Sequence, residues 1–261
     1  MTNIKGRIAF ITGASSGIGK GCAELFASQG VNLILAARRS ERLDSLSKEL
    51  SEKHGVEVLT RKLDVRRQPD VESTVNNLPE KWKDIDILVN SAGLGREHIP
   101  FHKGRIDDWD EIIDTNLKGL LYVSRAIAPL MVKRNSGHIV VIGSTAAYSV
   151  VPGSIAYCAT KWGMNVVAKT FKLDLAGTNV RVTIVHPGRT ETEFRLVFHR
   201  GDAELAKKHY EGVVPLTPKD VAEMVLFAVN RPPHVNIAEM VVTPTDYEKY
   251  RSKVLMPKEN R

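Results

Sequence analysis

The feature that most restricts the fold of this sequence is a regular alternation of short apolar runs with longer amphipathic segments. The apolar runs are rich in Val and Ile, have the length of strands, and lie at residues 8–11, 31–36, 56–63, 85–89, 139–142 and 180–185. The segments between them have helical length and periodicity and lie at 17–29, 40–54, 70–82, 106–134 and 155–176. Strands that alternate with helices form a parallel sheet covered on both faces. The sequence therefore predicts an α/β fold with a doubly wound parallel sheet.

The alternation continues without a Pro-, Gly- or Ser-rich linker or an internal repeat, so we expect a single domain over residues 1–261. Residues 187–218 carry turn signals and one short helical piece. This segment is long enough for a substrate lid. A helix near 220–230 and a strand near 239–242 are expected to complete the sheet, and residues 247–261 form a C-terminal tail.

Composition narrows the class of protein. The 261 residues are 43% hydrophobic and 26% charged, which suits a soluble globular chain with one large core. No apolar run approaches the roughly 18 residues that span a bilayer, and the N-terminal apolar segment is too short for a secretory signal, so we expect a cytoplasmic protein without membrane contact. The net charge of +7 is interleaved with acids and lacks aromatic stacking positions, which argues against nucleic acid. Cys22 and Cys158 are expected to be reduced thiols, and the histidines lack metal-ligand spacing, so no metal is predicted.

A glycine-rich turn, Thr-Gly-Ala-Ser-Ser-Gly-Ile-Gly, follows the first predicted strand and opens the first predicted helix. Glycines let the backbone approach a phosphate, while the new helix offers unpaired N–H groups and the positive end of its dipole. At the first β-to-α turn of an alternating chain, such a loop indicates a Rossmann-like dinucleotide site. The residues of this loop predicted to bind the cofactor are Gly13, Ser15, Ser16, Gly17, Ile18 and Gly19.

The end of the second predicted strand indicates which dinucleotide binds. NAD-preferring proteins commonly carry an acid there, against the ribose hydroxyls, whereas this chain has Arg38 and Arg39. Two guanidiniums offer forked, charge-assisted hydrogen bonds to a 2′-phosphate, so the sequence predicts NADP. The alternative interpretation is that both arginines only solvate the start of a helix.

Tyr157 and Lys161 lie one helical turn apart, and Ser144 ends the preceding predicted strand. Helical side chains at i and i+4 share a face, so the phenol and the ammonium can enter one pocket, with Ser144 opposite them. A free tyrosine titrates near pH ~10, so using it as an acid or base near neutrality requires stabilising the phenolate by about 4 kcal/mol. A fixed cation provides such stabilisation. Taken alone, however, the pair is also typical of an ordinary helix surface.

Together these motifs resemble the short-chain dehydrogenase/reductase family over nearly the whole chain. The other matching motifs are Asp64-Val65, which borders the adenine in that family, Asn90-Ser-Ala92-Gly93, Asp-Thr-Asn116-Leu-Lys and Pro187-Gly188. The family commonly has Asn where this chain has Ser91. The resemblance implies cofactor contacts from the following residues besides the glycine loop and the arginines: Asp64, Val65, Asn90, Ala92, Gly93, Tyr157, Lys161, Pro187, Gly188, Thr190 and Thr192.

The resemblance also implies a catalytic tetrad of Asn116, Ser144, Tyr157 and Lys161. Tyr157 would transfer the hydroxyl proton while hydride moves to or from the nicotinamide, and Ser144 would hold the substrate oxygen. Lys161 would lower the pKa of Tyr157 and bind the nicotinamide ribose. Asn116 would anchor a water between Lys161 and solvent; alternatively, it caps local backbone. The family further implies a homotetramer or dimer, formed through the predicted helices 106–134 and 155–176.

Several shorter motifs, such as His-Val-Asn-Ile at 234–237, resemble the branch that oxidises serine and related 3-hydroxy acids with NADP. A small carboxylate needs a cation, and Arg189, Arg195 and Arg200 lie in the predicted lid, although each is equally explained as a solvated charge. The sequence thus predicts an enzyme, an NADP-dependent oxidoreductase acting on a small alcohol or carbonyl. The alternatives are a 3-oxoacyl-carrier-protein reductase or another ketone or sugar reductase and, outside this class, a nucleotide-sensing or RNA-binding module without turnover.

Overall fold

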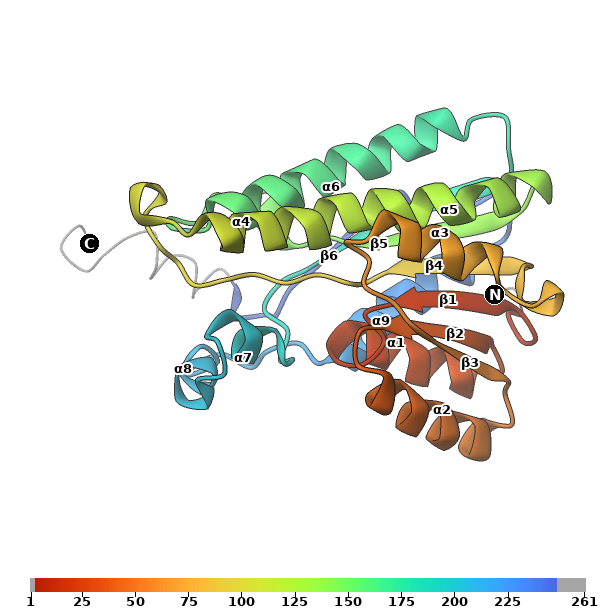
Figure 1. Ribbon diagram of the computed structural model, residues 1–261, viewed down its shortest axis with the longest axis horizontal. Helices are drawn as coiled ribbons and strands as arrows, with labels where there is room; N and C mark the ends of the chain where they lie inside the picture. Colours follow the sequence, from red (N-terminus) through yellow and green to blue (C-terminus); the bar gives the residue numbers. More distant parts are fainter. Residues whose placement is uncertain (1–2, 248–261) are drawn as a thin grey trace.

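The chain forms one seven-stranded sheet covered by helices on both faces (Figure 1), as described by a computed structural model for residues 3–247. The strand order is β3-β2-β1-β4-β5-β6-β7, and every neighbouring pair is parallel. The strands are β1 (Ile8–Thr12), β2 (Asn32–Ala37), β3 (Val58–Lys62), β4 (Ile85–Asn90), β5 (Gly137–Ile142), β6 (Val180–Pro187) and β7 (Glu239–Val242). The predicted doubly wound sheet is confirmed. The predicted tail lies outside the described residues beyond Tyr247.

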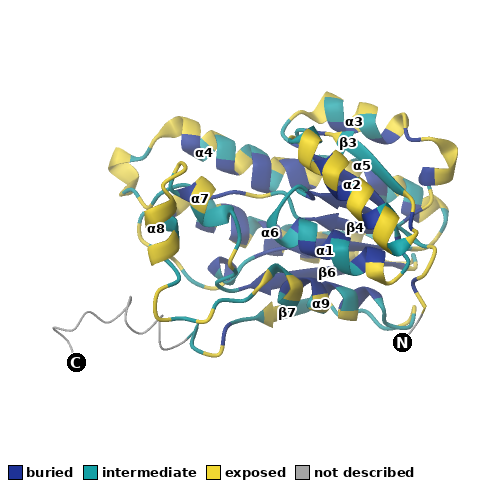
Figure 2. Cartoon of the chain, turned by 90° about the horizontal axis from the view of Figure 1, so that it is seen from below, coloured by how far each residue is buried: buried dark blue, intermediate teal, exposed yellow. Residues whose placement is uncertain are grey.

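Two apolar layers hold the helices to the sheet. One contains side chains of α1 (Gly17–Ser28), α2 (Ser40–His54) and α9 (Pro218–Val229), and the other contains those of α3 (Gln68–Asn76), α5 (Gly119–Lys133) and α6 (Ile155–Asp174). The strands contribute alternate residues to each layer: Ile11 and Leu33 to the first, Phe10 and Ile34 to the second. Because both faces are covered, the strands read as continuous apolar runs. Figure 2 shows them buried between helices whose outer faces are exposed.

The strand order reverses direction at β1. The chain first builds outward from β1 to β3 and then returns to place β4 on the other side of β1. Loops that follow the carboxyl ends of β1 and β4 therefore diverge, which leaves a crevice between them. In doubly wound sheets this crevice is where ligands bind.

Two predicted helices are interrupted. The segment predicted as one helix over 70–82 is α3 followed by a short 3-10 turn, η1 (Glu80–Trp82), because Pro79 has no N–H with which to continue the helix. The segment predicted over 106–134 consists of α4 (Ile106–Ile113), a π-helical turn, η3 (Asp114–Lys118), and α5. Such turns contain i→i+5 hydrogen bonds and often occur at functional sites.

The lid, residues 187–218, contains two short helices where one helical piece was predicted. They are α7 (Phe194–Phe198) and α8 (Ala203–Lys208), which lie together beyond the end of the sheet (Figure 1). The lid ends where Thr217 caps α9 in a reciprocal capping box with Asp220. No helix within residues 3–247 is both long and apolar enough to cross a membrane.

Candidate active site

A cavity of about 730 Å³ lies where the carboxyl ends of the strands meet the lid. Most residues predicted for the site line it: Gly13, Ser15, Ser16, Gly17, Ile18, Arg38, Arg39, Asp64, Val65, Ala92, Gly93, Ser144, Tyr157, Lys161, Pro187, Gly188, Thr190 and Thr192. Gly19, Asn90 and Asn116 lie behind this lining and support it, as described below. The fold therefore brings together, in one cavity, predicted residues that lie between Gly13 and Thr192 in the sequence.

The glycine loop has the backbone geometry that a dinucleotide phosphate requires. Gly13 and Gly17 have φ angles of 66° and 54°, in the region that favours glycine. A Cβ on Gly13 would lie 3.0 Å from the backbone of Ala92, and one on Gly17 would lie 3.2 Å from Cβ of Thr192. The loop opens directly into α1, whose first N–H groups have no partner within the helix. These residues fit the pyrophosphate of a dinucleotide.

Behind the loop, two predicted residues, Gly19 and Asn90, and the unpredicted Thr12 support the site. A Cβ on Gly19 would lie 2.5 Å from the carbonyl oxygen of Gly13, so α1 can pack here only with glycine. Asn90 is buried at the end of β4 and donates to Ser124 Oγ at 3.1 Å. Thr12 Oγ1 accepts hydrogen bonds from the N–H groups of Ser91 and Ala92 at 3.0 and 3.1 Å. This last contact joins the loops after β1 and β4.

Tyr157 and Lys161 share the cavity with Ser144, as the sequence predicts. Lys161 Nζ lies 5.7 Å from the centre of the Tyr157 ring and donates to the carbonyl oxygen of Ile142 at 3.2 Å. Ser144 Oγ accepts from the N–H of Ala146 at 3.1 Å, which fixes the serine at the end of β5. The three side chains therefore meet from α6 and from the loop after β5.

Burial controls the protonation of this cluster. It raises the pKa of Tyr157, against opposing effects of the Ser144 hydrogen bond and the Arg195 charge. It also lowers the pKa of Lys161 to about 8. The family resemblance implied a lowered pKa for Tyr157, but in this structure the removal of the phenol from water outweighs the Ser144 hydrogen bond and the Arg195 charge. Tyr157 is thus a proton donor at neutral pH.

Asn116 occupies the π-helical turn and is buried. Its Oδ1 accepts from the N–H of Leu94, and its Nδ2 donates to the Leu94 carbonyl, both at 2.9 Å, and to Thr160 Oγ1 at 3.2 Å. A Cβ on Gly93 would lie 3.3 Å from Asn116 Oδ1 and 3.8 Å from Lys161 Nζ. Asn116 therefore holds backbone close to Lys161, which agrees with the alternative of local backbone capping.

Ser144 has a buried neighbour that sequence reasoning missed. The Ser144 backbone nitrogen lies 3.2 Å from Nδ1 of His186, and the His186 side chain is fully buried. Burial lowers the pKa of His186, so its ring is neutral; Nδ1 also lies 3.0 Å from the Ser144 carbonyl oxygen, and the ring tautomer decides which of these two backbone groups it bonds. A Cβ on Gly143 would lie 2.5 Å from His186 Nδ1. Pairing of β5 with β6 creates this contact, and no local pattern signals it.

Arg38 and Arg39 both line the cavity but point to different partners. Arg39 folds over the glycine loop and donates to Ser15 Oγ at 3.1 Å and Ser16 Oγ at 2.8 Å. Its Nη1 also donates to Glu193 of the lid at 2.8 Å. Arg38 Nη1 lies 3.9 Å from Glu111 Oε1 of α4. The positive charge predicted at the end of β2 is therefore present beside the glycine loop.

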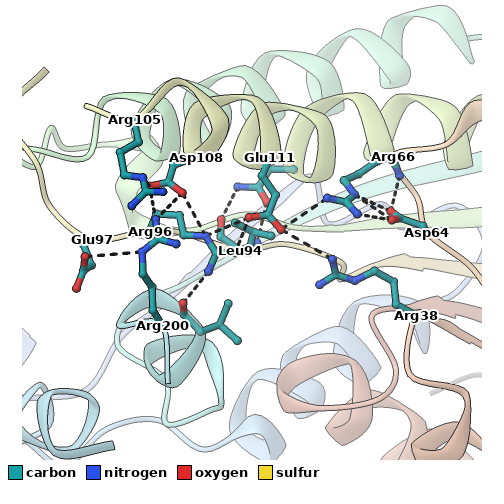
Figure 3. Close-up of polar contacts among 12 residues, drawn as sticks. Arg38, Asp64, Arg66, Leu94, Arg96, Glu97, Arg105, Asp108, Glu111 and Arg200 are labelled. Atoms are coloured by element: carbon teal, nitrogen blue, oxygen red, sulfur yellow. Dashed lines mark hydrogen bonds and ion pairs between the residues drawn. The ribbon is translucent and has the colours of Figure 1, made fainter. Parts of the chain in front are cut away.

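A network of alternating charges runs from Asp64 to the lid (Figure 3). Arg66 contacts both carboxylate oxygens of Asp64 and lies 3.6 Å from Glu111. Arg96 hydrogen-bonds Glu111 and donates to the carbonyl of Val197 in α7 at 2.7 Å.

At the lid end of the same network, Arg200 donates to both oxygens of Asp108 at 2.7 and 2.6 Å. Arg96 and Val197 are 101 positions apart in the sequence, and Asp108 and Arg200 are 92 positions apart. Pattern reasoning did not find these contacts because nothing local pairs such distant charges.

The three lid arginines have different environments. Arg200 is held by Asp108, and Arg189 Nη1 donates to the carbonyl of His209 at 2.5 Å. The guanidinium of Arg195 lies over the rings of Phe198 and Phe194, at 4.8 and 5.6 Å from their centres.

Arg195 is the lid arginine whose charge acts on Tyr157. The Phe194 ring beneath it lies 5.6 Å from the Tyr157 ring, and Arg195 lines the cavity. Burial, together with the charges of Arg195 and Arg189, lowers the pKa of His209 to about 2. The lid thus places positive charge at the Tyr157 end of the cavity.

Fold and site together define a dinucleotide-binding oxidoreductase of the α/β class. The family described as short chain dehydrogenase matches residues 7–200, and the chain belongs to this family, as its motifs predicted. The NADP-dependent 3-hydroxy acid dehydrogenase YdfG of Salmonella typhi is 44% identical over 238 residues, which cover 91% of this chain and 94% of that protein. Sulfoacetaldehyde reductase 2 of Chromohalobacter salexigens is 42% identical over 239 residues, with coverage of 91% and 94%.

A solved structure is similarly related. The closed form of serine dehydrogenase complexed with NADP+ superposes with a TM-score of 0.86 and 42% sequence identity, covering 90% of this chain and 94% of that one. The likeness therefore extends over most of both chains.

Proposed function

We propose that this protein is an NADP(H)-dependent dehydrogenase of small 3-hydroxy acids, or a reductase of the corresponding carbonyl compounds. The observation that carries the proposal is the meeting of Tyr157, Ser144 and Arg195 in one cavity with the glycine loop. The cofactor agrees with the NADP-dependent relatives and with the NADP+ complex of serine dehydrogenase. It also agrees with two arginines where an NAD-preferring protein commonly has an acid.

The cluster supplies acid–base chemistry to one carbonyl or carbinol oxygen. Ser144 Oγ donates a hydrogen bond to that oxygen, and Tyr157 gives its proton during reduction or removes the hydroxyl proton during oxidation. Lys161 places a cation within 5.7 Å of the Tyr157 ring centre and thereby favours the phenolate when it forms. Bound NADP(H) supplies the hydride or accepts it. Asn116 keeps the backbone of Leu94 in place beside Lys161.

We assign Arg195 to the anionic group of the substrate. The Phe198 and Phe194 rings hold its guanidinium at the Tyr157 end of the cavity, and its charge acts on Tyr157. A planar guanidinium suits a carboxylate through two parallel hydrogen bonds. A substrate with its hydroxyl on one carbon and its acid group a short distance away would reach both Tyr157 and Arg195.

A matched pair of substrates tests this function. Serine and other 3-hydroxy acids should be oxidised with NADP+, and the neutral methyl ester of the same hydroxy acid should have a kcat/KM about 10- to 100-fold lower, the range for loss of a charged hydrogen bond. Arg195→Leu should lower kcat/KM for the acid and leave the ester nearly unchanged. Tyr157→Phe should nearly abolish turnover and still bind NADPH.

Other outcomes would contradict the proposal. Equal kcat/KM values for acid and ester would remove the role of Arg195. Turnover of 3-oxoacyl carrier protein without activity on free hydroxy acids would favour the carrier-protein reductase instead. Binding of NADPH without any turnover across hydroxy acids, sugars and ketones would favour a nucleotide sensor.

We also propose that α5 and α6 form an interface with a second copy of this chain, within a homotetramer or dimer. Both helices expose apolar side chains, among them Val132 of α5 at 40% and Val166 and Leu173 of α6 at 64% and 75%. Apolar patches of this kind are typical of protein–protein interfaces. Light scattering should give a multiple of 28.9 kDa, and Val166→Lys should reduce it; a monomeric wild-type protein would contradict the interface.

We place the protein in the cytoplasm as a further proposal. Both cysteines within the described residues are free and buried thiols, which suits a reducing compartment. Cell fractionation with an antibody against the chain would test the location, and recovery outside the cytoplasm would contradict it.

A further inference from the structure

The lid contacts the cofactor side of the cavity through one carboxylate. Glu193 Oε2 accepts from Arg39 at 2.8 Å, and Glu193 Oε1 accepts from Arg42 at 2.5 Å. Arg39 at the same time donates to Ser15 and Ser16 of the glycine loop. The three charged side chains are between 36% and 50% exposed, so solvent and an incoming anion can reach them.

We propose that Glu193 determines cofactor preference by competing with the 2′-phosphate of NADP(H) for Arg39. This inference rests on the proposed function, because it assumes that the cofactor binds at this glycine loop. The 2′-phosphate and the Glu193 carboxylate are both anions that seek the same guanidinium. When the phosphate binds Arg39, Glu193 loses one of its two partners and its contact to the loop.

The charge of Glu193 and its position at the glycine loop support competition for Arg39 rather than a shared site. Partial burial disfavours the Glu193 anion, yet hydrogen bonds from Arg42 and Arg39 hold its pKa below the ordinary value, so the carboxylate is charged at neutral pH. A phosphate dianion beside a charged carboxylate is repelled. Thr192 adjoins Glu193 in the chain and packs against the position of Gly17, so the lid segment itself lies at the phosphate loop.

A second attachment of the lid lies at the opposite side of α7 and provides a control. Arg200 is held there by Asp108, and this contact involves no residue near Arg39. Breaking it loosens the lid and leaves the contacts of Arg39 with Glu193 and the glycine loop in place. Asp108→Asn is therefore the matched variant for Glu193→Gln.

The test is equilibrium binding of NADPH and NADH, measured by fluorescence titration without substrate. Because ion pairs of this exposure contribute little, Glu193→Gln should tighten NADPH binding by about three- to fivefold and change NADH binding by less than about twofold. Asp108→Asn should leave the ratio of the two dissociation constants at the wild-type value. High salt should reduce the difference between wild type and Glu193→Gln, because it screens the competing charges.

The results separate this inference from the proposed function. Failure of the wild-type protein to bind either cofactor would refute the function and the inference together. If wild type binds NADPH but Glu193→Gln binds it more weakly, Glu193 orients Arg39 for the phosphate and competition is wrong. An equal change in NADPH and NADH affinity, or the same change in ratio from Asp108→Asn, would show a general effect of the lid and would also overturn the proposal.

Discussion

Replacing the buried Lys161 with methionine should make the protein more stable at neutral pH. The Lys161 side chain is 6% exposed, and burial lowers its pKa from 10.5 to about 8. This lowering of the pKa corresponds to a penalty of about 3 kcal/mol for holding the ammonium charged in the folded state. Losing the hydrogen bond to Ile142 offsets about 1 kcal/mol. Lys161→Met should therefore raise the free energy of unfolding by about 2 kcal/mol at pH 7.

The lowered pKa of Lys161 makes the stability of the protein depend on pH. Below pH 8 the lysine is charged in both the folded and unfolded states, and the folded protein bears the full penalty. Between pH 8 and about 10.5 the unfolded chain binds more protons than the folded one, so the stability of the wild type rises with pH. The advantage of Lys161→Met should consequently disappear by about pH 10.5.

Urea unfolding at pH 7 and pH 10, followed by tryptophan fluorescence, measures both effects. The exposed Lys172 on the same helix supplies the control, since Lys172→Met should change stability by less than about 0.5 kcal/mol at either pH. A wild type as stable as Lys161→Met at pH 7, or a difference that does not shrink as the pH rises, would refute the reasoning. Turnover of Lys161→Met should also fall. The protein therefore keeps the buried Lys161 for catalysis although its charge lowers the free energy of unfolding.

Three further predictions concern the cofactor loop and the proton. Arg39→Ser should raise KM for NADPH by about 10- to 100-fold in steady-state kinetics and leave KM for NADH within about threefold, because it removes a charged hydrogen bond; equal changes would contradict the 2′-phosphate assignment. Gly19→Ala should destabilise the protein by about 1–3 kcal/mol in thermal unfolding, because its Cβ would lie 2.5 Å from the Gly13 carbonyl. Burial raises the pKa of Tyr157 above its ordinary value of 10, so kcat/KM for alcohol oxidation should increase with pH from neutrality to pH 10 while that for carbonyl reduction stays constant; a flat profile for oxidation would exclude Tyr157 as the titrating base.

Local patterns predicted the sheet well because each strand is buried on both faces and each helix has one apolar face. They failed where a single residue changes the backbone: Pro79 ends one predicted helix early, and the π-helical turn divides another. Neither event alters the periodicity of hydrophobic residues enough to be read from it.

The candidate site was predictable to the extent that its residues sit in motifs with fixed spacing. Tyr157, Lys161 and Ser144 meet in the cavity for this reason. The partners of Arg39 and Arg96 were not predictable, because Glu193 and Val197 reach them through the fold from more than a hundred positions away. The raised pKa of Tyr157 could not be predicted from the sequence either, since it depends on how completely the ring is buried.

The π-helical turn at Asp114–Lys118 makes the length of this segment as important as its composition. A π-helical turn takes up about one residue more than an α-helical turn, so deleting one residue here would let a regular helix run through with the faces of α4 and α5 kept nearly in place. Such a deletion would remove the widened turn from which Asn116 bonds both backbone groups of Leu94. The extra residue in this segment therefore serves the site, and its deletion should lower turnover while the packing of α5 on the sheet is retained.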